Sequence, residues 1–403
     1  MANLQILNEI NNLDNKNLPS LINRLNEKGY NNLSFKEDDD LILIHNNKSD
    51  NLDIKLTELE NECRTVILSK ELEFIGAHFN EIQYNPTSLY NINLNECIIQ
   101  ESIEGTTLMC FNHNNKWHIS TRRCINASSS KWIKDVSYET LMFDVFNNEQ
   151  NTIDNFFNSL NPSNYYFFSL IHPLNQNIIR YNHHPTLYNK SKCLIHYLTR
   201  RKGTMNEVYY NIQNFNNVIS SSNIHFNSVN DIFNTIQHMN NLNIQNNFVI
   251  YEGLVIRYYI NGVCNIIKLQ TQSYLYSKSI KPNYNDQTKC YIHAFKNNNL
   301  KQYLNIFTDY DPKQKANIVR TTLNTFKNLT TKLMTLYFQT RNKNNKELYE
   351  KLDGNSKVIL YKLHGLYLQR CQDPNIQKPT ITYNMIFNIL KNEMDTDIIY
   401  KLL

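Results

Sequence analysis

The stretch Glu101-Ser102-Ile103-Glu104-Gly105-Thr106-Thr107-Leu108 decides how the rest of the chain is interpreted. It lies between apolar runs that are rich in residues favouring β-strands. It leads into residues 109–111, then a polar tip at 112–116, then a second run at 117–123. This order predicts a strand, a hairpin tip and a returning strand that ends in a pair of adjacent arginines.

The groups at this hairpin are suited to holding phosphate. Glu104 offers a carboxylate, Gly105 offers accessible backbone amides, and Arg122 and Arg123 offer guanidiniums, which grip phosphate through two hydrogen bonds. Together they predict a nucleotide or phosphate site. The turn contains no obvious nucleophile, so its own chemistry is incomplete.

The composition is that of a folded protein. The chain has 403 residues, of which 41% are hydrophobic and 12% aromatic, so it is long enough for two or three domains and too apolar to be disordered. Its formal charge of +5 comes from 41 basic and 36 acidic residues. This balance is only mildly basic and does not by itself indicate nucleic-acid binding.

Cysteine spacing and hydropathy bear on the compartment. The eight cysteines form no CxxC pair, so no zinc site is predicted, and most are expected to be buried thiols in a reducing compartment. The N-terminus lacks a signal-peptide pattern. The best apolar run is interrupted by Glu252, Arg257 and Lys268, so no membrane span is expected. A cytoplasmic protein without a membrane partner is predicted.

Two segments before the turn invite functional interpretations. Residues 62–68 read as a strand entered by Arg64, whose guanidinium is expected either to hold phosphate or to form a salt bridge with Glu62 or Glu60 at the strand edge. The acidic run Glu37-Asp38-Asp39-Asp40 predicts a solvated turn rather than a metal site. No metal ligands are predicted elsewhere.

Strand patterns continue to about residue 280. Residues 138–146 and 153–160 have helical spacing, and residues 165–171 read as a strand that a turn connects to a returning strand at 178–181. Two further strands are predicted at the segments that carry Glu252 and Lys268.

Beyond residue 280 the apolar spacing becomes helical, which predicts an all-helical C-terminal domain. The predicted domains are therefore an N-terminal helical and strand extension (1–50), a central domain (51–280) and a helical domain (281–403). Lysines of the last domain either contact RNA phosphates or form a solvated helix face.

The turn resembles that of covalent nucleotidyltransferases, and most closely that of phage-type RNA ligases and their relatives in giant viruses (nucleocytoplasmic large DNA viruses). Those proteins carry Lys-x-Asp/Glu-Gly at this turn, whereas this chain reads Ser102-Ile103-Glu104-Gly105. The resemblance implies an α+β fold with an ATP-grasp-like, antiparallel-sheet nucleotidyltransferase core and an all-α C-terminal domain. It also implies that Arg64 faces a nucleotide or RNA end, that Glu252 serves a metal or nucleotide, and that Lys268 neutralises phosphate.

Three positions depart from the family pattern. Ser102 replaces the lysine that attacks the α-phosphate, Ser169 stands where a glutamate is expected, and Gln270 replaces a second phosphate-binding lysine. These departures predict that covalent nucleotidyl transfer is lost and that no residue is catalytic. Displaced lysines that would rescue transfer are Lys116 and Lys131.

Three functions are therefore carried forward. The first is a catalytically degenerate RNA ligase-like protein that binds a nucleotide or RNA end in viral RNA metabolism, in the cytoplasm, a viral factory or the virion. The second is an active ligase with a relocated lysine, using ATP and Mg2+. The third is a scaffold subunit of a viral transcription, RNA-processing or translation assembly. The residues predicted to bind nucleotide or RNA are Arg64, Glu104, Gly105, Arg122, Arg123, Glu252 and Lys268.

Overall fold

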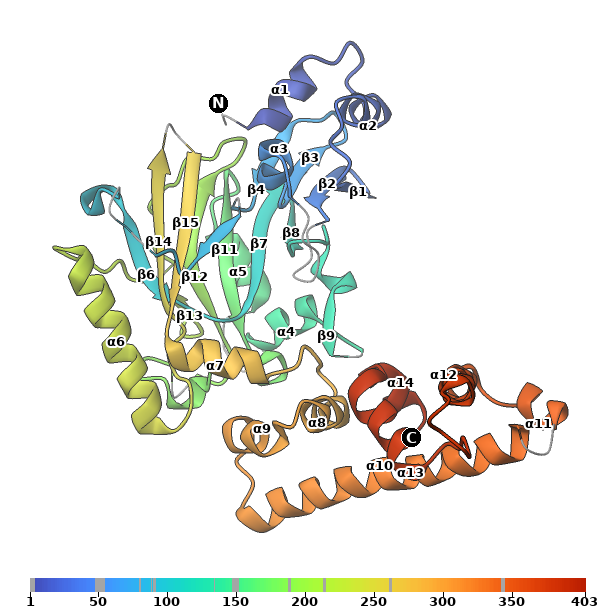
Figure 1. The fold of residues 1–403 in the computed structure, drawn as a ribbon. Coiled ribbons are helices and arrows are strands. Elements are labelled where there is room, and N and C mark those ends of the chain that lie inside the picture. The colour runs from blue at the N-terminus through green and yellow to red at the C-terminus, as the bar shows by residue number, and fades with distance from the viewer. Residues whose placement is uncertain are drawn as a thin grey trace. The chain divides into compact units, whose positions relative to one another are not determined.

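The computed structural model describes residues 4–47, 55–79, 81–87, 89, 92–133, 135–146, 152–187, 190–212, 215–260, 263–341 and 345–403. The chain divides into two compact units, Met1–Leu275 and Tyr276–Leu403 (Figure 1). The boundary lies five residues before the one predicted from the sequence, and each unit is considered by itself.

An N-terminal sheet opens the first unit, covered by two helices. Asn17 caps the second helix by accepting a hydrogen bond from the Ser20 amide, and Pro19 lies in its first turn. Helical and strand elements were both predicted for residues 1–50. The helices are α1 (Gln5–Asn11) and α2 (Leu18–Glu27), and the antiparallel strands, in sheet order, are β1 (Leu33–Asp38), β2 (Leu41–Asn46), β3 (Val66–Ser69) and β4 (Phe74–Ala77).

Two sequence expectations for this sheet need adjustment. The strand expected at residues 62–68 begins only at Val66, because Thr57 and Glu60 form a capping box that starts a short helix, α3 (Glu58–Glu62). The strands on either side of residue 50 share one sheet, since β2 pairs with β3. The acidic run does form the exposed turn between β1 and β2, with Asp39 in a left-handed conformation.

A five-stranded sheet forms the centre of the unit. The hairpin predicted after the Ser102 turn is confirmed, and its two-residue tip places Asn114 and Asn115 at positive φ. Only the β12–β13 pairing is parallel among these strands. In sheet order they are β13 (Val218–Ser220), β12 (Cys193–Arg201), β11 (Asn164–Ile171), β7 (Thr106–His113) and β8 (Lys116–Ser120).

A four-stranded sheet faces the central one. Its β15–β5 pairing is parallel and its other pairings are antiparallel. In sheet order the strands are β5 (Ile82–Tyr84), β15 (Val263–Gln270), β14 (Gly253–Ile260) and β6 (Ile98–Ser102). A two-stranded sheet, β9 (Lys131–Ile133) and β10 (Val136–Ser137), lies apart from them.

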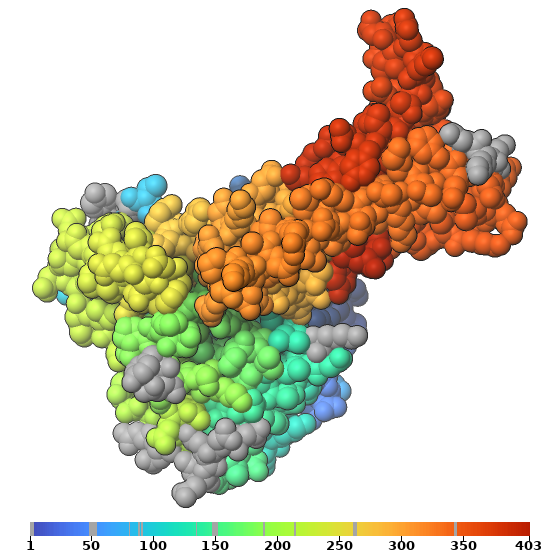
Figure 2. All heavy atoms as spheres, turned by 90° about the horizontal axis from the view of Figure 1, so that it is seen from below, coloured from blue at the N-terminus to red at the C-terminus, as the bar shows by residue number. Residues whose placement is uncertain are grey.

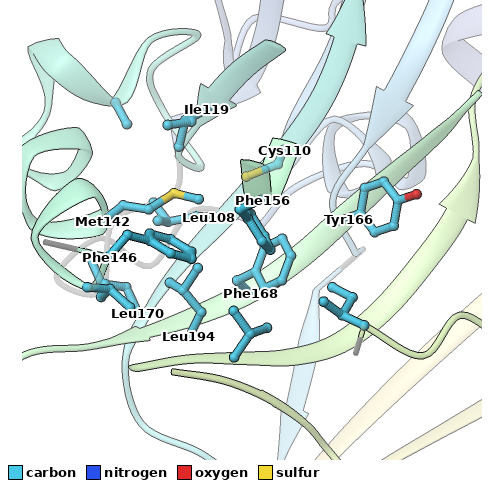
Figure 3. Close-up of a cluster of buried hydrophobic side chains, with 14 of the residues drawn as sticks. Leu108, Cys110, Ile119, Met142, Phe146, Phe156, Tyr166, Phe168, Leu170 and Leu194 are labelled. Atoms are coloured by element: carbon cyan, nitrogen blue, oxygen red, sulfur yellow. The ribbon is translucent and has the colours of Figure 1, made fainter. Parts of the chain in front are cut away.

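Helices cover the outer faces of the two sheets, and strand alternation decides which side chains they meet. On the central sheet, Leu108, Tyr166, Phe168 and Leu194 pack in one buried cluster with α4 (Tyr138–Asp144) and α5 (Ile153–Ser159), which were both predicted (Figure 3). On the other sheet, alternate residues pack against α6 (Val229–Asn246), and these are Leu254, Ile256, Ile267 and Leu269.

The inner faces of the two sheets share another cluster, in which Met109, Phe111 and Phe167 meet Ile266. Alternate residues of β14 and β15 point outward to α6, as described above. The residues between them therefore point toward the central sheet. This arrangement leaves room for a cavity between the sheets.

The returning strand predicted at residues 178–181 is wrong. The backbone amides of Ile178 and Ile179 donate to the Glu104 carboxylate, and the Arg180 amide donates to the Val249 carbonyl, so this segment cannot also complete a ladder with β11. Its place beside β11 is taken by β12.

The second unit is helical throughout its described residues, as predicted. Its core holds Phe326, Leu333, Ile359 and Leu363 among others. The α+β class, the antiparallel sheets and the helical C-terminal region are thus confirmed. After α7 (Gln272–Ile280), which spans the boundary, the helices are α8 (Gln287–Lys296), α9 (Leu300–Phe307), α10 (Pro312–Arg341), α11 (Lys346–Glu350), α12 (Gly354–Gln372), α13 (Tyr383–Asn388), a π-helical turn (Ile389–Glu393) and α14 (Thr396–Lys401).

Cysteine and hydropathy features can also be placed. All eight cysteines are thiols and five are buried. Among the described helices, none has the length and apolar character needed to cross a bilayer.

Gly253, the first residue of β14, lies where β14 pairs closely with β15. Its φ is +146°, and a Cβ there would lie 1.9 Å from the Leu269 carbonyl oxygen. We expect Gly253→Ala to lower the free energy of unfolding by about 2–4 kcal/mol, because the β14–β15 pairing must shift. Denaturant unfolding followed by tryptophan fluorescence measures this, since Trp117 and Trp132, the two tryptophans, lie in the first unit.

The matched control is Gly29→Ala, which also has positive φ, +83°, but has no atom within 4 Å of the added Cβ. It should cost only about 1–2 kcal/mol, from the backbone conformation alone. Equal losses for the two variants would contradict the steric argument.

Candidate functional site

A cavity of about 290 Å³ lies between the two sheets of the first unit. The four-stranded sheet contributes β6, β14 and β15 to its walls, and the central sheet contributes β7, β11 and β12. Among the lining residues are three that were singled out from the sequence as departures or matches: Ser102, Ser169 and Lys268.

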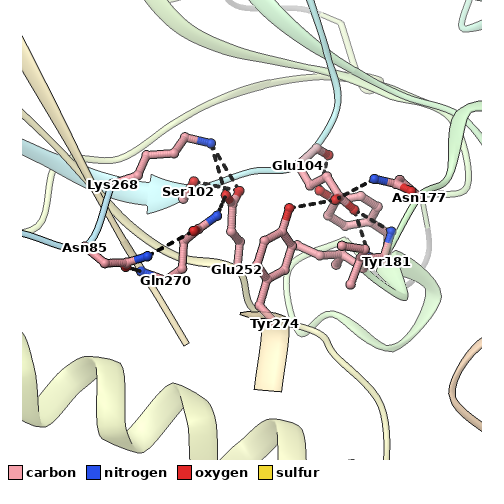
Figure 4. Close-up of polar contacts among 11 residues, drawn as sticks. Asn85, Ser102, Glu104, Asn177, Tyr181, Glu252, Lys268, Gln270 and Tyr274 are labelled. Atoms are coloured by element: carbon pink, nitrogen blue, oxygen red, sulfur yellow. Dashed lines mark hydrogen bonds and ion pairs between the residues drawn. The ribbon is translucent and has the colours of Figure 1, made fainter. Parts of the chain in front are cut away.

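The carboxylate of Glu252 organises one end of this cavity (Figure 4). Ser102 Oγ donates to Glu252 Oε2 at 2.8 Å, Lys268 Nζ lies 3.2 Å from both carboxylate oxygens, and Gln270 Nε2 donates to Oε1 at 2.9 Å. The three donors come from two strands, β6 and β15. Residues that are far apart in the chain are therefore tied together by a single acidic group.

Backbone geometry fixes this arrangement. Glu252 immediately precedes Gly253, the first residue of β14, and its carbonyl accepts a hydrogen bond from the Thr271 amide. Gln270 is oriented by Asn85, whose side chain accepts from the Gln270 amide at 2.7 Å and donates to Gln270 Oε1 at 3.2 Å. The glutamine at the expected lysine position therefore serves as a neutral, oriented donor to Glu252.

The pKa of Glu252 is lowered despite its burial. Burial on its own raises the pKa, but the Lys268 ammonium and the hydrogen bonds from Gln270 and Ser102 outweigh it. Glu252 is consequently ionised at neutral pH and forms a partly buried ion pair with Lys268.

Cations dominate the cavity lining. Arg64, Arg122, Arg257 and Lys268 all line it, and Glu101 is the single acidic residue among the lining residues. The Glu101 carboxylate is already engaged by His184 Nε2 at 2.6 Å. Two of the four cations already face carboxylates outside the lining, since Arg257 Nε lies 3.4 Å from Glu207 Oε1 and Lys268 Nζ lies 3.2 Å from Glu252 Oε2. An anion that enters the cavity would share these cations with their present partners.

His78 is a neutral polar group in this cationic surrounding. Burial, followed by the charges of Arg64, Arg200 and Arg122, lowers its pKa to about 3. Its Nε2 atom is buried and has no hydrogen-bond partner within the described part of the chain. Because this atom is enclosed by the protein, an anion in the cavity would act on the ring through its charge rather than through a direct hydrogen bond.

Aromatic rings form another part of the wall. Phe79 stacks on Tyr197 with ring centroids 6.3 Å apart and on Phe167 at 5.6 Å, and the Arg200 guanidinium lies 4.7 Å from the centre of the Phe79 ring. Phe79 and Tyr197 both line the cavity, as does Val255 of β14. Flat aromatic and apolar surfaces beside cations suit a ligand with a planar ring and a phosphate.

Glu104 lies outside the cavity lining and holds a neighbouring loop instead. Its Oε2 accepts from the amides of Ile178 and Ile179 at 2.7 and 2.9 Å, and its Oε1 accepts from Tyr274 Oη at 2.9 Å and Asn177 Nδ2 at 3.3 Å. All four donors are neutral. Burial therefore prevails over the hydrogen bonds, and the pKa of Glu104 is raised.

Gly105 and Arg123 are likewise not among the residues that line the cavity. A Cβ at Gly105 would lie 2.8 Å from the Leu170 carbonyl, so glycine permits close approach to β11. The Arg123 carbonyl accepts a hydrogen bond from Lys36 at 2.6 Å. Of the predicted binding residues, the cavity brings together Arg64, Arg122 and Lys268, with Glu252 behind them.

The displaced lysines proposed from the sequence lie elsewhere. Lys116 is exposed at the start of β8 and Lys131 is exposed in β9, and neither lines the cavity. The lining lysine is Lys268. Within the described ranges, no three His, Cys, Asp or Glu side chains gather in a manner that could hold a metal ion.

Sequence reasoning missed His78, Phe79, Tyr197 and Arg257. Arg257 had a usable signal, because a strand period of two places it on the same face as Val255. Tyr197 offered none, because β12 was not predicted. His78 and Phe79 follow β4, and nothing in their spacing indicates which sheet they would face.

Comparisons with known proteins give distant structural likenesses. No protein-family model and no curated protein sequence matches the chain. A putative ATP-dependent DNA ligase from Aquifex aeolicus matches with a TM-score of 0.39 and 13% identity over 87% of this chain and 80% of the other. Two forms of an archaeal ATP-dependent RNA ligase match with TM-scores of 0.41 and 0.39 and identities of 12% and 10%, covering 78% and 75% of this chain and 80% and 75% of theirs.

The two buried carboxylates should respond oppositely to pH. Because the folded-state pKa of Glu252 is lowered, its contribution to stability is present above the unfolded pKa near 4.5 and is lost as pH falls. We expect Glu252→Gln to lower the free energy of unfolding by roughly 2–4 kcal/mol at pH 7, because it leaves Lys268 without its counter-charge. The loss should shrink toward acid pH.

Glu104→Gln is the matched control. The folded-state pKa of Glu104 is raised, so the wild-type carboxylate is most favourable when protonated and loses stability as pH rises through that pKa. The loss caused by Glu104→Gln should therefore be larger at acid pH than at pH 7. Denaturant titrations from about pH 2.5 to about pH 8 measure both trends, because the contribution of Glu252 is lost only below its unfolded pKa. Parallel trends would contradict the assigned shifts.

His78 reports directly on cavity occupancy. A phosphate near its ring stabilises the imidazolium, so ligand binding should raise the pKa of His78 from about 3, and affinity should increase as pH falls toward the bound-state value. Imidazole NMR signals recorded with and without AMP measure this. A pKa of His78 that stays unchanged at saturating AMP would show that the phosphate binds elsewhere.

Proposed function

We propose that the cavity binds the phosphate-bearing part of a nucleotide or of an RNA end, without forming a covalent bond to it. The observation that carries this proposal is the lining itself, in which four cationic side chains lie beside Phe79 and Tyr197. Guanidiniums bind phosphate oxygens in pairs, and aromatic rings stack on bases. Arg64, Arg122 and Lys268 are the predicted binding residues that the proposal keeps, and Arg257 is added.

The loss of covalent transfer is supported by the contacts of Ser102. Its hydroxyl donates to Glu252, whose carboxylate is positioned to accept its proton. A carboxylate whose pKa is lowered is a weak base, so Ser102 is not activated as a nucleophile. We therefore infer a degenerate ligase-like site that retains phosphate binding. The resemblance to giant-virus ligases is what suggests viral RNA metabolism as the setting.

One observation favours a second candidate, an active nucleotidyltransferase. Lys268 places an amine in the cavity, and the carboxylate oxygen that it contacts also accepts from Ser102. In this candidate Lys268 would attack the α-phosphate in place of the absent lysine. Against it, an ammonium held by Glu252 carries no lone pair for attack until it loses a proton. ATP would be held by the cavity cations.

A labelling experiment separates the two candidates. The protein is incubated with α-labelled ATP or GTP and Mg2+ and analysed by denaturing electrophoresis, and equilibrium nucleotide binding is measured in parallel. We expect nucleotide binding without a covalent band. Arg64→Ala should weaken binding at least about tenfold, since it removes a charge-assisted phosphate contact.

Lysine variants identify the residue that carries any covalent label. A labelled band that persists in Lys116→Arg and Lys131→Arg but disappears in Lys268→Arg would establish transfer through Lys268. Absence of nucleotide and RNA-end binding at low salt would favour the scaffold subunit, in which the cavity has no ligand.

A further inference from the structure

Charge is divided very unevenly between the two units. The second unit, residues 276–403, has 20 lysines and arginines against 10 aspartates and glutamates, a net charge of +10. The first unit has 21 against 26, a net charge of −5. The modest net charge of the whole chain therefore conceals a strongly basic helical unit.

Within that unit, α10 concentrates the positive charge. Its 30 residues include six lysines and arginines and no aspartate or glutamate. Most long surface helices mix both signs and are stabilised by pairs four residues apart. The cations of α10 therefore have no acidic partner within the helix itself.

Three of these cations form one stripe. Lys313, Arg320 and Lys327 are spaced by seven residues, which is close to two helical turns, so they lie in line along about 21 Å of the helix axis. All three are exposed. The buried residues of the helix, such as Phe326 and Leu333, occupy the opposite side.

The rest of the exposed surface of α10 carries one further exposed lysine, Lys332, and is otherwise largely polar and uncharged. Between and beyond the cations it presents exposed amides and hydroxyls, which can donate to phosphate oxygens: Asn317, Asn324, Asn328, Thr331 and Thr335. Figure 1 shows the other helices of the unit along one side of α10, and Figure 2 shows α10 atoms, in orange, at the surface.

None of the ion pairs recorded among the described residues involves the stripe. Elsewhere in the unit, by contrast, Lys351 pairs with Glu347 at 2.6 Å and Lys362 pairs with Glu393 at 2.6 Å. Of the charged side chains in the stripe, Arg320 has a recorded contact within the helix, from its Nη2 to Asn317 Oδ1 at 2.9 Å. The backbone of the stripe makes further contacts, since the Lys313 amide donates to Asp311 Oδ1 at 2.7 Å and the Lys327 carbonyl accepts from Tyr383 Oη at 3.4 Å.

We propose that the stripe Lys313–Arg320–Lys327 binds the phosphate backbone of an RNA strand. A line of unopposed cations with flanking amides fits a linear polyanion and reads no base sequence. An anionic lipid surface fits less well, because membrane-bound helices need an apolar face in contact with the lipid and this face has none. The surface is separate from the cavity, although RNA as the ligand class rests on the proposed function.

The test uses the full chain and a fluorescein-labelled uridine homopolymer RNA. Binding is measured by anisotropy at several salt concentrations for the wild type and for Lys313→Gln/Arg320→Gln/Lys327→Gln. We expect the triple variant to bind at least about tenfold more weakly near 0.1 M salt. For this variant, the slope of log affinity against log salt concentration should be less steep by about 2. Each of the three lost phosphate contacts removes about 0.7 from the slope.

The matched control is Lys351→Gln/Lys362→Gln/Lys378→Gln, which removes the same charge from exposed positions of the same unit. Its affinity should change less than about threefold, because general attraction depends on net charge while contacts depend on position. Equal losses in both triple variants, or an unchanged salt slope in the stripe variant, would overturn the proposal. Circular dichroism melting verifies that both variants fold.

Two further arms separate the possible partners and proposals. If phosphatidylserine vesicles bind the wild type as tightly as RNA does, and the stripe variant loses both, the surface is a membrane site and the proposal fails. AMP binding should be unchanged in the stripe variant. If AMP does not bind the wild type while the stripe still governs RNA affinity, the cavity function fails and the stripe stands.

Discussion

The ionised carboxylate of Glu252 is the group on which the site depends. It lies at the start of β14, in the middle of the four-stranded sheet, and takes hydrogen bonds from β6 and β15 on its two sides. A buried charge is tolerated only when other groups compensate it, and here one ammonium and two neutral donors do so. Removing the Lys268 charge would leave a carboxylate that the surrounding sheet could not easily accommodate.

This requirement bears on the two positions at which the resemblance implies lysines. Ser102 and Gln270 are both shorter or less charged than the lysines expected from the resemblance, yet each donates to Glu252. The carboxylate therefore remains satisfied without either lysine. Among the described residues that line the cavity, the lysine is Lys268, and its ammonium is committed to the ion pair with Glu252.

Two buried glutamates, Glu104 and Glu252, illustrate how the surroundings of a side chain decide its role. Glu104 and Glu252 are both buried, but Glu252 faces a cation and Glu104 faces four neutral donors, so their pKa values move in opposite directions. Glu104 accepts hydrogen bonds from the loop that follows β11, whereas Glu252 shapes the cavity.

The two units also differ in net charge. The first unit, which encloses the cavity, is acidic, and the helical unit, which carries the stripe on α10, is basic.

The sequence by itself determined the elements whose cause is local. Asn114 and Asn115 set the hairpin tip, Pro19 and Asn17 start α2, and periodicity predicted the helical C-terminal region. The sequence also singled out Arg64, Arg122 and Lys268, which line the cavity. The tertiary structure alone decided that these residues share a cavity with Arg257 and His78, that Glu104 lies outside it, and that residues 178–181 form no strand. Those outcomes depend on which hydrogen-bond donors, distant in the sequence, reach the buried carboxylates of Glu104 and Glu252. The spacing of residues along the chain does not specify these contacts.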